Sequence, residues 1–383
     1  MNLLMISSNT KVAAGLRSGN FYNNLTYFGR HFNRVDVICP HVKEAAVKKI
    51  NANVFIHSLP KGKLLESYYV YKKGLEIFSL TKPNLISAHA YGLQLMSLGA
   101  WLLAKKTKTP LILEIHHIEG FPRAATLADW LMKVMSFGFI KIAKSEAVAF
   151  RVVNQCELTP LLKSLGVNDQ QIVYLCSMYL NKKIFYPSLE NESKEYDLIF
   201  VGRLISNKGL KQLLEAFTIA KRDLPGIKLI ILGDGPLRKW LQRKIRNQNN
   251  VFHFLPVPLS EVAGFYKKSK LVVCSSYAEG GPLFVLEAMA CGLPAVSTPV
   301  GIMKEVVKSD HNGFLLNEWS AKEMAGAIIK ILTDEDLYKK CSANAIATAM
   351  QFDYEKIVND YVLTYKKIAQ YYENTCHCTG VGF

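Results

Sequence analysis

Short runs of apolar residues alternate with longer segments in which apolar residues recur at helical spacing, and this alternation continues along most of the chain. Short apolar runs are typical of strands buried on both faces of a parallel sheet, and the longer segments suit helices that cross back between them. The runs form two sets of five. We therefore predict an α/β protein with two Rossmann-like sheets. The predicted strands are Leu3–Ser7, Val35–Cys39, Asn53–His57, Leu85–Ala88 and Leu111–Ile115, then Asp197–Val201, Lys228–Leu232, Val251–Phe254, Leu271–Cys274 and Ala295–Ser297.

A polar, acidic segment separates the two sets of strands. Residues 181–196 have the composition of an exposed linker between domains. The chain of 383 residues is long enough for two domains, which we place at 1–180 and 197–353. A helical pattern over 354–372 follows the second domain, and residues 373–383 form a tail without a structural signal.

The loop after the first strand of the second half combines two glycines with two basic side chains. It runs from Gly202 through Arg203 and Lys208 to Gly209, and a helix is predicted from Leu210. Glycines let the backbone approach a ligand closely, and a helix N-terminus supplies free N–H groups and the positive end of its dipole. Arg203 adds a planar guanidinium with several N–H donors, and Lys208 adds a compact positive charge. We predict that this loop binds a diphosphate, the alternative being an ordinary turn with surface basic residues.

Two glutamates lie eight residues apart in the segment that follows the strand ending at Cys274. Glu279 lies at the tip of a loop, and Glu287 lies inside the next helix among apolar residues. A carboxylate in an apolar helix is unexpected unless it pairs or binds a ligand. Carboxylates accept paired hydrogen bonds from vicinal hydroxyls, so two of them could grip two sugar rings joined by a diphosphate. The alternative is one acid at a helix start and one salt-bridged glutamate.

The segment from Glu279 to Glu287 resembles the E-x7-E motif of the GT-B glycosyltransferases of family GT4. The surrounding sequence EGGPLFVLEAMACGLPAVST is similar to that family's signature almost letter for letter, and VGRLISNKG resembles its phosphate loop. The turn Gly233-Asp234-Gly235-Pro236 resembles the family's GDGP turn. The resemblance covers nearly the whole second domain. It implies two facing Rossmann-like domains, with the C-terminal helix crossing back to the first.

The resemblance also implies an activity. The chain would transfer a sugar from a nucleotide-diphosphate sugar with retention at the anomeric carbon, without a metal or another cofactor. Arg203 and Lys208 would hold the diphosphate, Glu279 and the amides after it the donor sugar, and Glu287 the ribose. The catalytic residues are then expected to be Arg203, Lys208, Glu279 and His116, and the substrate-binding residues Glu287, Gly15, Gly202, Gly280, Gly281, Pro282, Leu283 and His117.

The first domain resembles the family less closely. Gly15 stands where the family has a pair of glycines after the first strand, but the second position is Leu16. His116 follows a predicted strand where the family places a histidine near the reacting sugar. The adjacent His117 is an alternative for that role, and a packing role stays open for either. His89 also ends a predicted strand and either lines the cleft or is structural.

Charge is unevenly distributed along the chain. The formal net charge is +16, and residues 1–180 carry 21 basic and 10 acidic side chains. Such an excess suggests a surface that faces something anionic. The basic and aromatic segment Lys61–Lys73 and the apolar segment Trp130–Lys141, with its spaced lysines, predict contact with an anionic membrane and a carbohydrate or lipid-linked acceptor. The alternative is that Trp130–Ile140 packs on the sheet. No nucleic-acid-binding module is evident, so we expect no nucleic-acid partner.

Other patterns narrow the location and the function. The longest apolar run is too short to span a membrane, and the N-terminus reads as a strand and not as a signal peptide. The eight cysteines include no CxxC pair, so we expect a cytoplasmic protein, peripheral at the inner face of the membrane. The acidic residues 334–336 resemble a metal-binding DxD, but they lie between helical segments, where we expect a helix cap and no metal. A sugar-nucleotide epimerase and a catalytically silent sugar-nucleotide-binding protein remain the alternative functions.

Overall fold

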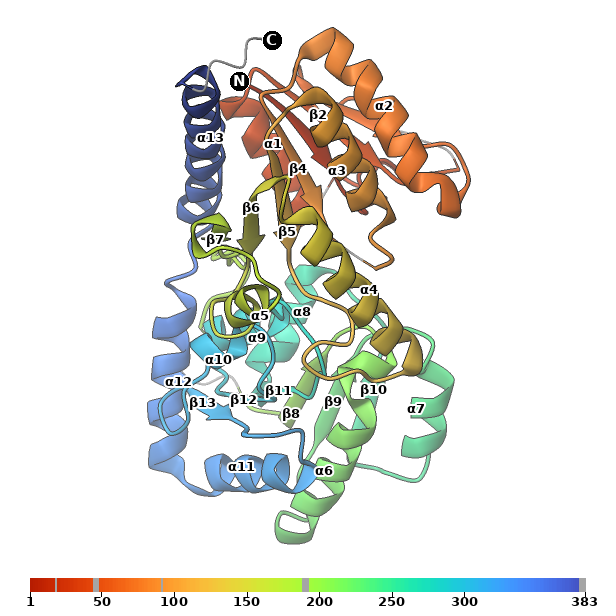
Figure 1. The fold of residues 1–383 in the computed structure, drawn as a ribbon. Helices are drawn as coiled ribbons and strands as arrows, with labels where there is room; N and C mark the ends of the chain where they lie inside the picture. Colours follow the sequence, from red (N-terminus) through yellow and green to blue (C-terminus); the bar gives the residue numbers. More distant parts are fainter. Residues whose placement is uncertain (18, 44–47, 91, 188–192, 379–383) are drawn as a thin grey trace.

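The structure is a computed structural model that describes residues 1–17, 19–43, 48–90, 92–187 and 193–378. It contains two parallel sheets, one above the other in Figure 1. The first has the order β3-β2-β1-β4-β5-β6-β7, and the second has the order β10-β9-β8-β11-β12-β13. The strands are β1 Asn2–Ile6, β2 Arg34–Cys39, β3 Val54–Ser58, β4 Leu85–His89, β5 Leu111–Ile115, β6 Ala147–Val152, β7 Ile172–Tyr174, β8 Tyr196–Val201, β9 Leu229–Leu232, β10 Val251–Phe254, β11 Ser269–Cys274, β12 Ala295–Ser297 and β13 Gly313–Leu315.

Helices cover both faces of each sheet, which explains why the strands are apolar runs and not alternating patterns. In the first domain, α2, α3 and α4 pack on one face and α1 and α13 on the other. In the second, α8, α9, α10 and α12 cover one face and α6, α7 and α11 the other. The helices are α1 Asn20–His31, α2 Glu66–Thr81, α3 Leu95–Thr107, α4 Leu127–Ala143, α5 Leu158–Ser164, α6 Leu210–Asp223, α7 Arg238–Ile245, α8 Leu259–Lys267, α9 Leu283–Ala290, α10 Met303–Val306, α11 Ala321–Thr333, α12 Glu335–Ala349 and α13 Tyr354–Cys378, with 3-10 turns η1 Lys63–Leu65, η2 Asp169–Gln171 and η3 Ser206–Lys208.

All ten predicted strands are present, with ends within two residues of the prediction. The prediction of five strands in each sheet is wrong, because β6, β7 and β13 were missed and the sheets have seven and six described strands. In β6 the buried Arg151 interrupts the apolar run. The edge strands β7 and β13 have three residues each and are partly exposed, so they lack the buried run that made the equally short β12 recognisable.

The last helix, α13, returns to the first domain, as predicted from the resemblance (Figure 1). Val358, Tyr361, Val362, Tyr365 and Ala369 are buried in one apolar cluster with β1, β2 and α1. Their spacing of three and four residues puts them on one face of the helix. The helix ends at residue 378, beyond the predicted end at 372. Among the described helices, none combines the length and apolarity that crossing a membrane requires.

The strand order of each sheet reverses at one point, between β1 and β4 in the first and between β8 and β11 in the second. In open parallel sheets, ligands bind beyond the carboxyl ends of the strands at such a reversal. The loops after these four strands therefore mark the expected site in each domain.

A carboxylate from each domain ties the domains together beside this region. Glu305 accepts hydrogen bonds from the backbone N–H groups of Gln155 and Cys156, at 2.6 and 2.8 Å. In the opposite direction, Glu157 accepts one from the N–H of Gly301 at 3.1 Å. These reciprocal contacts hold the loop after β12 against the loop after β6.

Candidate active site

A cleft of about 1130 Å³ lies between the two domains. Its walls come from the loops after β1, β4 and β5 of the first domain and after β8 and β11 of the second. Of the residues expected from the sequence, five line the cleft directly. These are Arg203, Gly281, Leu283, His116 and His117.

Two loops of the second domain are joined into one unit, the β8 loop (residues 202–209) and the β11 loop (residues 275–282). The Ser275 hydroxyl donates to the carbonyl of Lys208 at 2.8 Å. The Asn207 side-chain amide donates to the carbonyl of Ala278, and the N–H of Tyr277 donates to the carbonyl of Asn207, both at 2.8 Å. The two predicted ligand-binding loops therefore have a fixed relative position.

Lys208 and Glu279 meet at the junction of these loops. Their side chains form an ion pair, and the Ser276 hydroxyl donates to the same carboxylate oxygen at 2.9 Å. Both side chains are largely buried, with exposed fractions of 13% and 15%. Arg203, by contrast, is exposed at the cleft. Within the described residues, the Arg203 guanidinium has no hydrogen-bond or ion-pair partner, so it is open to an anion.

Close backbone contacts explain two glycines of the β8 loop region. Gly209 precedes α6 with a φ of 63°, and a Cβ there would lie 2.0 Å from the carbonyl oxygen of Ser275. A Cβ on Gly233, in the turn after β9, would lie 1.9 Å from the carbonyl oxygen of Gly202. Side chains at these positions would push the β8 loop, which carries Arg203 and Lys208, away from the β11 loop and from the turn after β9.

The glycines of the β11 loop let the second domain touch the first. A Cβ on Gly280 would lie 1.9 Å from the carbonyl oxygen of His116, and one on Gly281 would lie 2.7 Å from the Cγ atom of Met178. Pro282 follows, and α9 begins at Leu283. The N-terminus of α9 is therefore aimed at the interface of the two domains.

Glu287 lies one turn further along α9 than Leu283, on the same face of the helix. It is 9% exposed, and the Tyr266 hydroxyl donates to its carboxylate at 3.4 Å. Burial raises the pKa of Glu287 to about 7, against the lowering effect of Tyr266. The carboxyl group thus titrates near neutral pH.

Both candidate histidines line the cleft on the side of the first domain. The Nε2 atom of His116 lies 3.4 Å from a carboxylate oxygen of Glu114, and Nε2 of His117 lies 3.8 Å from one of Glu119. Burial lowers the pKa of His116 to about 4 despite Glu114, so its imidazole is neutral at pH 7. Gly15, with a φ of 94°, lies in the loop after β1.

The side chain after Gly15 changes the shape of that part of the cleft. Leu16 is exposed and lines the cleft. The family that the chain resembles has a second glycine at this position. The β1 loop therefore presents an apolar side chain beside the backbone amides.

Comparison with known proteins identifies the family. The sequence profile of the family "Glycosyl transferases group 1" matches residues 181–348, which include both the β8 and the β11 loops. Over this span, the chain matches the family that its motifs resemble. An uncharacterized glycosyltransferase of Methanocaldococcus jannaschii is 26% identical, over 83% of this chain and 86% of that protein.

Another relative has a name that states its reaction. The N,N'-diacetylbacillosaminyl-diphospho-undecaprenol alpha-1,3-N-acetylgalactosaminyltransferase of Campylobacter jejuni is 25% identical, over 62% of this chain and 65% of its own length. Seven curated relatives, this one included, are matched over 34% to 65% of their own length.

Solved structures confirm the GT-B fold of this glycosyltransferase. Sucrose-phosphate synthase from Thermosynechococcus elongatus superposes with a TM-score of 0.80 at 18% identity, covering 96% of this chain and 99% of that one. Anabaena HepE in complex with UDP and glucose superposes with a TM-score of 0.72 at 18% identity, covering 96% and 100%. The two Rossmann-like domains and the returning helix therefore form one known architecture.

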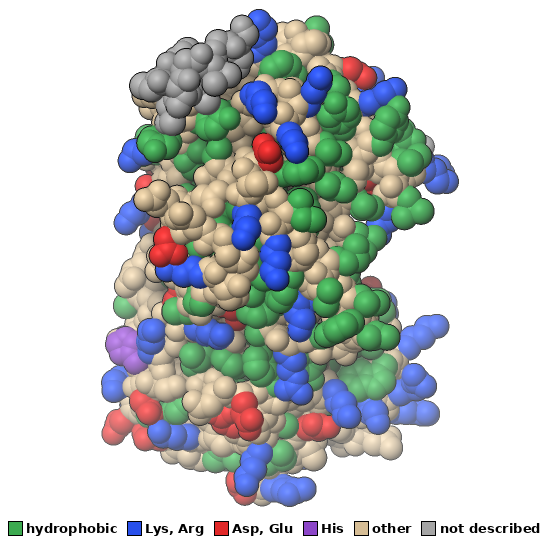
Figure 2. Space-filling model, in the orientation of Figure 1, with side chains coloured by type: hydrophobic (Ala, Val, Ile, Leu, Met, Phe, Trp, Pro, Cys, Tyr) green, Lys and Arg blue, Asp and Glu red, His purple; other side chains and the backbone are tan. Residues whose placement is uncertain are grey.

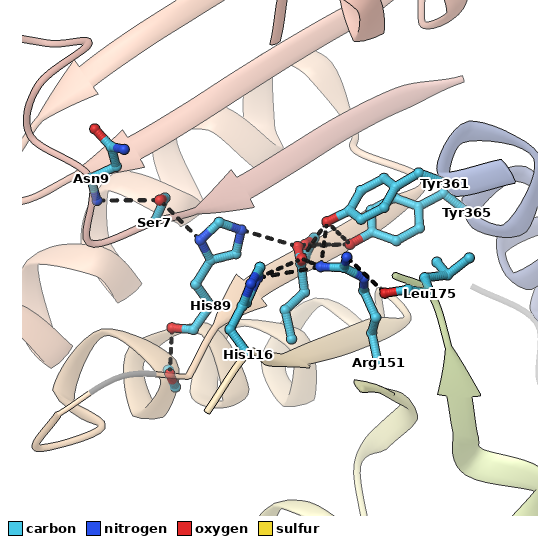
Figure 3. Close-up of polar contacts among 11 residues, drawn as sticks. Ser7, Asn9, His89, His116, Arg151, Leu175, Tyr361 and Tyr365 are labelled. Atoms are coloured by element: carbon cyan, nitrogen blue, oxygen red, sulfur yellow. Dashed lines mark hydrogen bonds and ion pairs between the residues drawn. The ribbon is translucent and has the colours of Figure 1, made fainter. Parts of the chain in front are cut away.

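The sequence analysis missed a buried polar cluster behind the histidines of this glycosyltransferase (Figure 3). Its centre is Glu114 in β5, which forms an ion pair with Arg151 of β6 at 2.6 Å and is fully buried. Tyr361 and Tyr365 of α13 also contact the carboxylate. A signal was present, because both Glu114 and Arg151 interrupt otherwise apolar strands.

Part of this cluster has the composition of a metal site. Ligand atoms of His89, Glu114 and His116 lie within 4.8 Å of one another. Arg151 already neutralises the carboxylate, which leaves little negative charge to attract a further cation.

The acidic residues 334–336 have the structural role that the sequence predicted. Asp334 precedes α12, and its side chain accepts a hydrogen bond from the N–H of Leu337 at 2.9 Å. This is the contact of an N-cap.

Proposed function

We propose that this glycosyltransferase moves a sugar from a nucleoside-diphosphate sugar, with retention and without a metal, to a lipid-linked or polysaccharide-precursor acceptor at an anionic membrane surface. The observation that carries the proposal is the joined pair of β8 and β11 loops, in which Arg203 and Gly281 line the cleft and Lys208 and Glu279 form an ion pair at the junction of the loops. HepE, which shares the fold, has been solved with UDP and glucose.

The donor side of the proposal rests on positive charge supplied by the chain itself. The exposed guanidinium of Arg203 meets the leaving diphosphate, while the N-termini of α6 and α9 add their dipoles. Lys208 exchanges its partner Glu279 for a phosphate oxygen. The released Glu279 carboxylate then accepts hydrogen bonds from hydroxyls of the donor sugar.

Such charge stabilises the leaving group as it departs, which is the task of a metal in other transferases. For retention, the acceptor hydroxyl attacks from the face that the diphosphate leaves, and a phosphate oxygen takes its proton. The neutral imidazole of His116 suits a role in orienting the sugar, since it adds no charge opposite the developing oxocarbenium ion.

The membrane part of the proposal rests on exposed apolar side chains of α4, η1 and α2, and Lys63 of η1 and Glu66 of α2 line the cleft. Leu127, Trp130 and Leu131 of α4 are 73%, 48% and 50% exposed, so this end of the helix does not pack on the sheet. Leu64 and Leu65 of η1 are also exposed. Figure 2 shows hydrophobic side chains gathered on the side that bears α2 and α4.

Charge on the same surface favours an anionic partner. Lys133 and Lys141 lie on α4, Lys61 precedes η1, and Lys63 is the first residue of η1. Because Lys63 also lines the cleft, an acceptor carried by a lipid would reach the site from this side. The Campylobacter relative, whose name gives an undecaprenol-linked diphosphate acceptor, supports the choice of acceptor.

A screen of donors and acceptors tests this function. The purified protein is incubated with UDP-, GDP- and ADP-sugars and with either short-chain polyprenyl-diphosphate sugars or soluble oligosaccharides. Nucleotide release and product mass report transfer, and NMR of the product reports the anomeric configuration. We expect one donor to give an α-linked product from an α-linked donor. Binding of a nucleotide without transfer to any acceptor would instead favour a silent binding protein, and recovery of an epimerised sugar an epimerase.

A further inference from the structure

One carboxylate in the first domain collects donors from four separate elements. Glu114 lies in β5, between β4 and β6 in the sheet, and is completely buried. Its Oε1 atom contacts the Ser87 hydroxyl, the Tyr365 hydroxyl at 2.7 Å and Nε2 of His89 at 3.2 Å. These partners come from β4 and from α13, which is more than two hundred residues away in sequence.

The second oxygen of Glu114 has a matching set of partners. Its Oε2 atom contacts the Arg151 guanidinium at 2.6 Å, the Tyr361 hydroxyl, and Nε2 of His116 at 3.4 Å. Each oxygen thus joins one tyrosine of α13 to one histidine of the cleft. Figure 3 shows the two tyrosine rings on one side of the carboxylate and the two imidazoles on the other.

The carboxylate is ionised in this environment. Burial by itself works to raise the pKa of Glu114, but the charge of His89, the hydrogen bonds of His116 and His89, and the charge of Arg151 outweigh it and hold the pKa well below its usual range. Burial of a charge is costly unless partners surround it, and replacing such a cluster by apolar side chains often stabilises a fold. Docking of α13 alone would therefore be served equally well by an apolar cluster in place of Glu114, Arg151 and the two tyrosine hydroxyls.

The hydrogen-bonded cluster extends from His89 to the residues that follow β1. The Nδ1 atom of His89 lies 3.1 Å from the Ser7 hydroxyl, which accepts a hydrogen bond from the N–H of Asn9 at 3.3 Å. Ser7, Asn9, His89 and His116 all line the cleft. The ring centroids of the two histidines are 5.1 Å apart. A change at Glu114 would thus reach both rings.

We propose that Glu114 is a positioning residue for His116 and His89, and that Tyr361 and Tyr365 of the crossing helix hold Glu114 in place for this task. The proposal deepens the proposed transfer function and rests on it for the role of the histidines. The crossing helix is then part of the catalytic apparatus: Tyr361 acts on His116 through Oε2, and Tyr365 acts on His89 through Oε1.

Removal of one hydroxyl at a time tests the proposal. Tyr361→Phe keeps the ring that packs on Phe28 of α1 and on Arg151, and Tyr365→Phe keeps the ring that packs on Tyr361. Tyr354→Phe is the matched control. Tyr354 lies on the same helix, and its hydroxyl donates to the carbonyl of Asn23 at 3.1 Å, away from Glu114. Circular dichroism and the melting temperature report whether each variant is folded.

The first measurement is independent of activity. Long-range ¹H–¹⁵N spectra of labelled histidines show the ring nitrogens, and His89→Gln and His116→Gln assign the two signals. We expect Tyr361→Phe to shift chiefly the His116 signals and Tyr365→Phe chiefly those of His89. The control Tyr354→Phe should leave both unchanged. If all three variants show wild-type ring signals, the tyrosines only pack, and the proposal is wrong.

The second measurement separates positioning from stability. With the donor found in the screen, we expect kcat to fall about tenfold in Tyr361→Phe, the scale of a misplaced catalytic group, with KM for the donor and the affinity for UDP unchanged. A lower melting temperature with wild-type kcat would also overturn the proposal. Ring signals that respond as expected in a protein that transfers no sugar would overturn the proposed function and leave the positioning by Glu114 intact.

Discussion

Lys208 and Glu279 form an ion pair that joins the β8 loop to the β11 loop. Because both side chains are largely buried, the pair is less screened by solvent than a surface pair would be. In the proposed reaction, the incoming diphosphate competes with Glu279 for Lys208. Loss of either partner should therefore disturb both the phosphate and the sugar contacts.

The first prediction concerns the two basic side chains of the β8 loop. Lys208→Ala and Arg203→Ala should each lower turnover about a hundredfold, because each removes a charge that stabilises the leaving diphosphate. Lys211→Ala is the control, since Lys211 lies in the first turn of α6, outside the β8 loop, and is 79% exposed. Steady-state nucleotide release measures the effect. Near-normal turnover in both variants would show that Arg203 and Lys208 do not stabilise the leaving diphosphate.

The second prediction is that Glu287→Gln stabilises the protein and weakens donor binding. A carboxyl whose pKa rises from 4.5 to about 7 on folding opposes folding when ionised. The cost is absent below pH 4.5, grows between pH 4.5 and 7, and reaches about 3 kcal/mol above pH 7. The variant should therefore melt at a higher temperature than the wild type at pH 8, and at a similar one at pH 5.

Binding should show the opposite trend for the same group. The ionised carboxylate is the better acceptor for ribose hydroxyls, so wild-type affinity for UDP should weaken as the pH falls below 7. In Glu287→Gln, affinity should be lower at pH 8 and nearly independent of pH. Calorimetric titration with UDP at several pH values measures both. If the affinity for UDP depends on pH equally in both proteins, Glu287 does not bind the nucleotide.

The sequence predicted the second domain more completely than the first, for a physical reason. Arg203, Lys208, Glu279 and Glu287 lie in two continuous segments, so their local patterns carry the information. The cluster around Glu114 is assembled from β4, β5, β6 and α13, and sequence alone does not show which buried polar residues meet. Glu114 and Arg151 were visible as polar residues in apolar strands, but their partners required the fold.

The third prediction tests the contact between the domains. Gly280→Ala would place a Cβ 1.9 Å from the carbonyl oxygen of His116, so the β11 loop and the β5 end must move apart. We expect turnover to fall at least tenfold, while UDP affinity, which depends mainly on the second domain, stays close to wild type. Gly264→Ala is the control, because a Cβ there meets no atom within 4 Å. Unchanged turnover would show that this contact is not needed for transfer.

The fourth prediction is that chelation leaves transfer largely intact. In the proposed mechanism, Arg203, Lys208 and the N-termini of α6 and α9 supply the positive charge at the diphosphate. Turnover measured after treatment with EDTA should remain within about twofold of the untreated protein. Complete loss that manganese restores would contradict the mechanism. His89→Gln and His116→Gln would then test whether the His89–Glu114–His116 group binds the ion.

The last prediction concerns the membrane surface. Sedimentation with phosphatidylglycerol vesicles should pellet the protein at low salt, and less of it at high salt, because screening weakens the attraction of Lys133 and Lys141. Leu131→Glu should abolish pelleting, since Leu131 is half exposed on α4 and a charge there opposes insertion. Leu363→Glu is the matched control, because Leu363 is similarly exposed, at 46%, but lies on α13, away from α4 (Figure 1). Equal loss in both variants would indicate a general effect of charge and not a docking surface. Wild-type protein that stays in the supernatant at low salt would exclude membrane docking and make a soluble acceptor the better hypothesis.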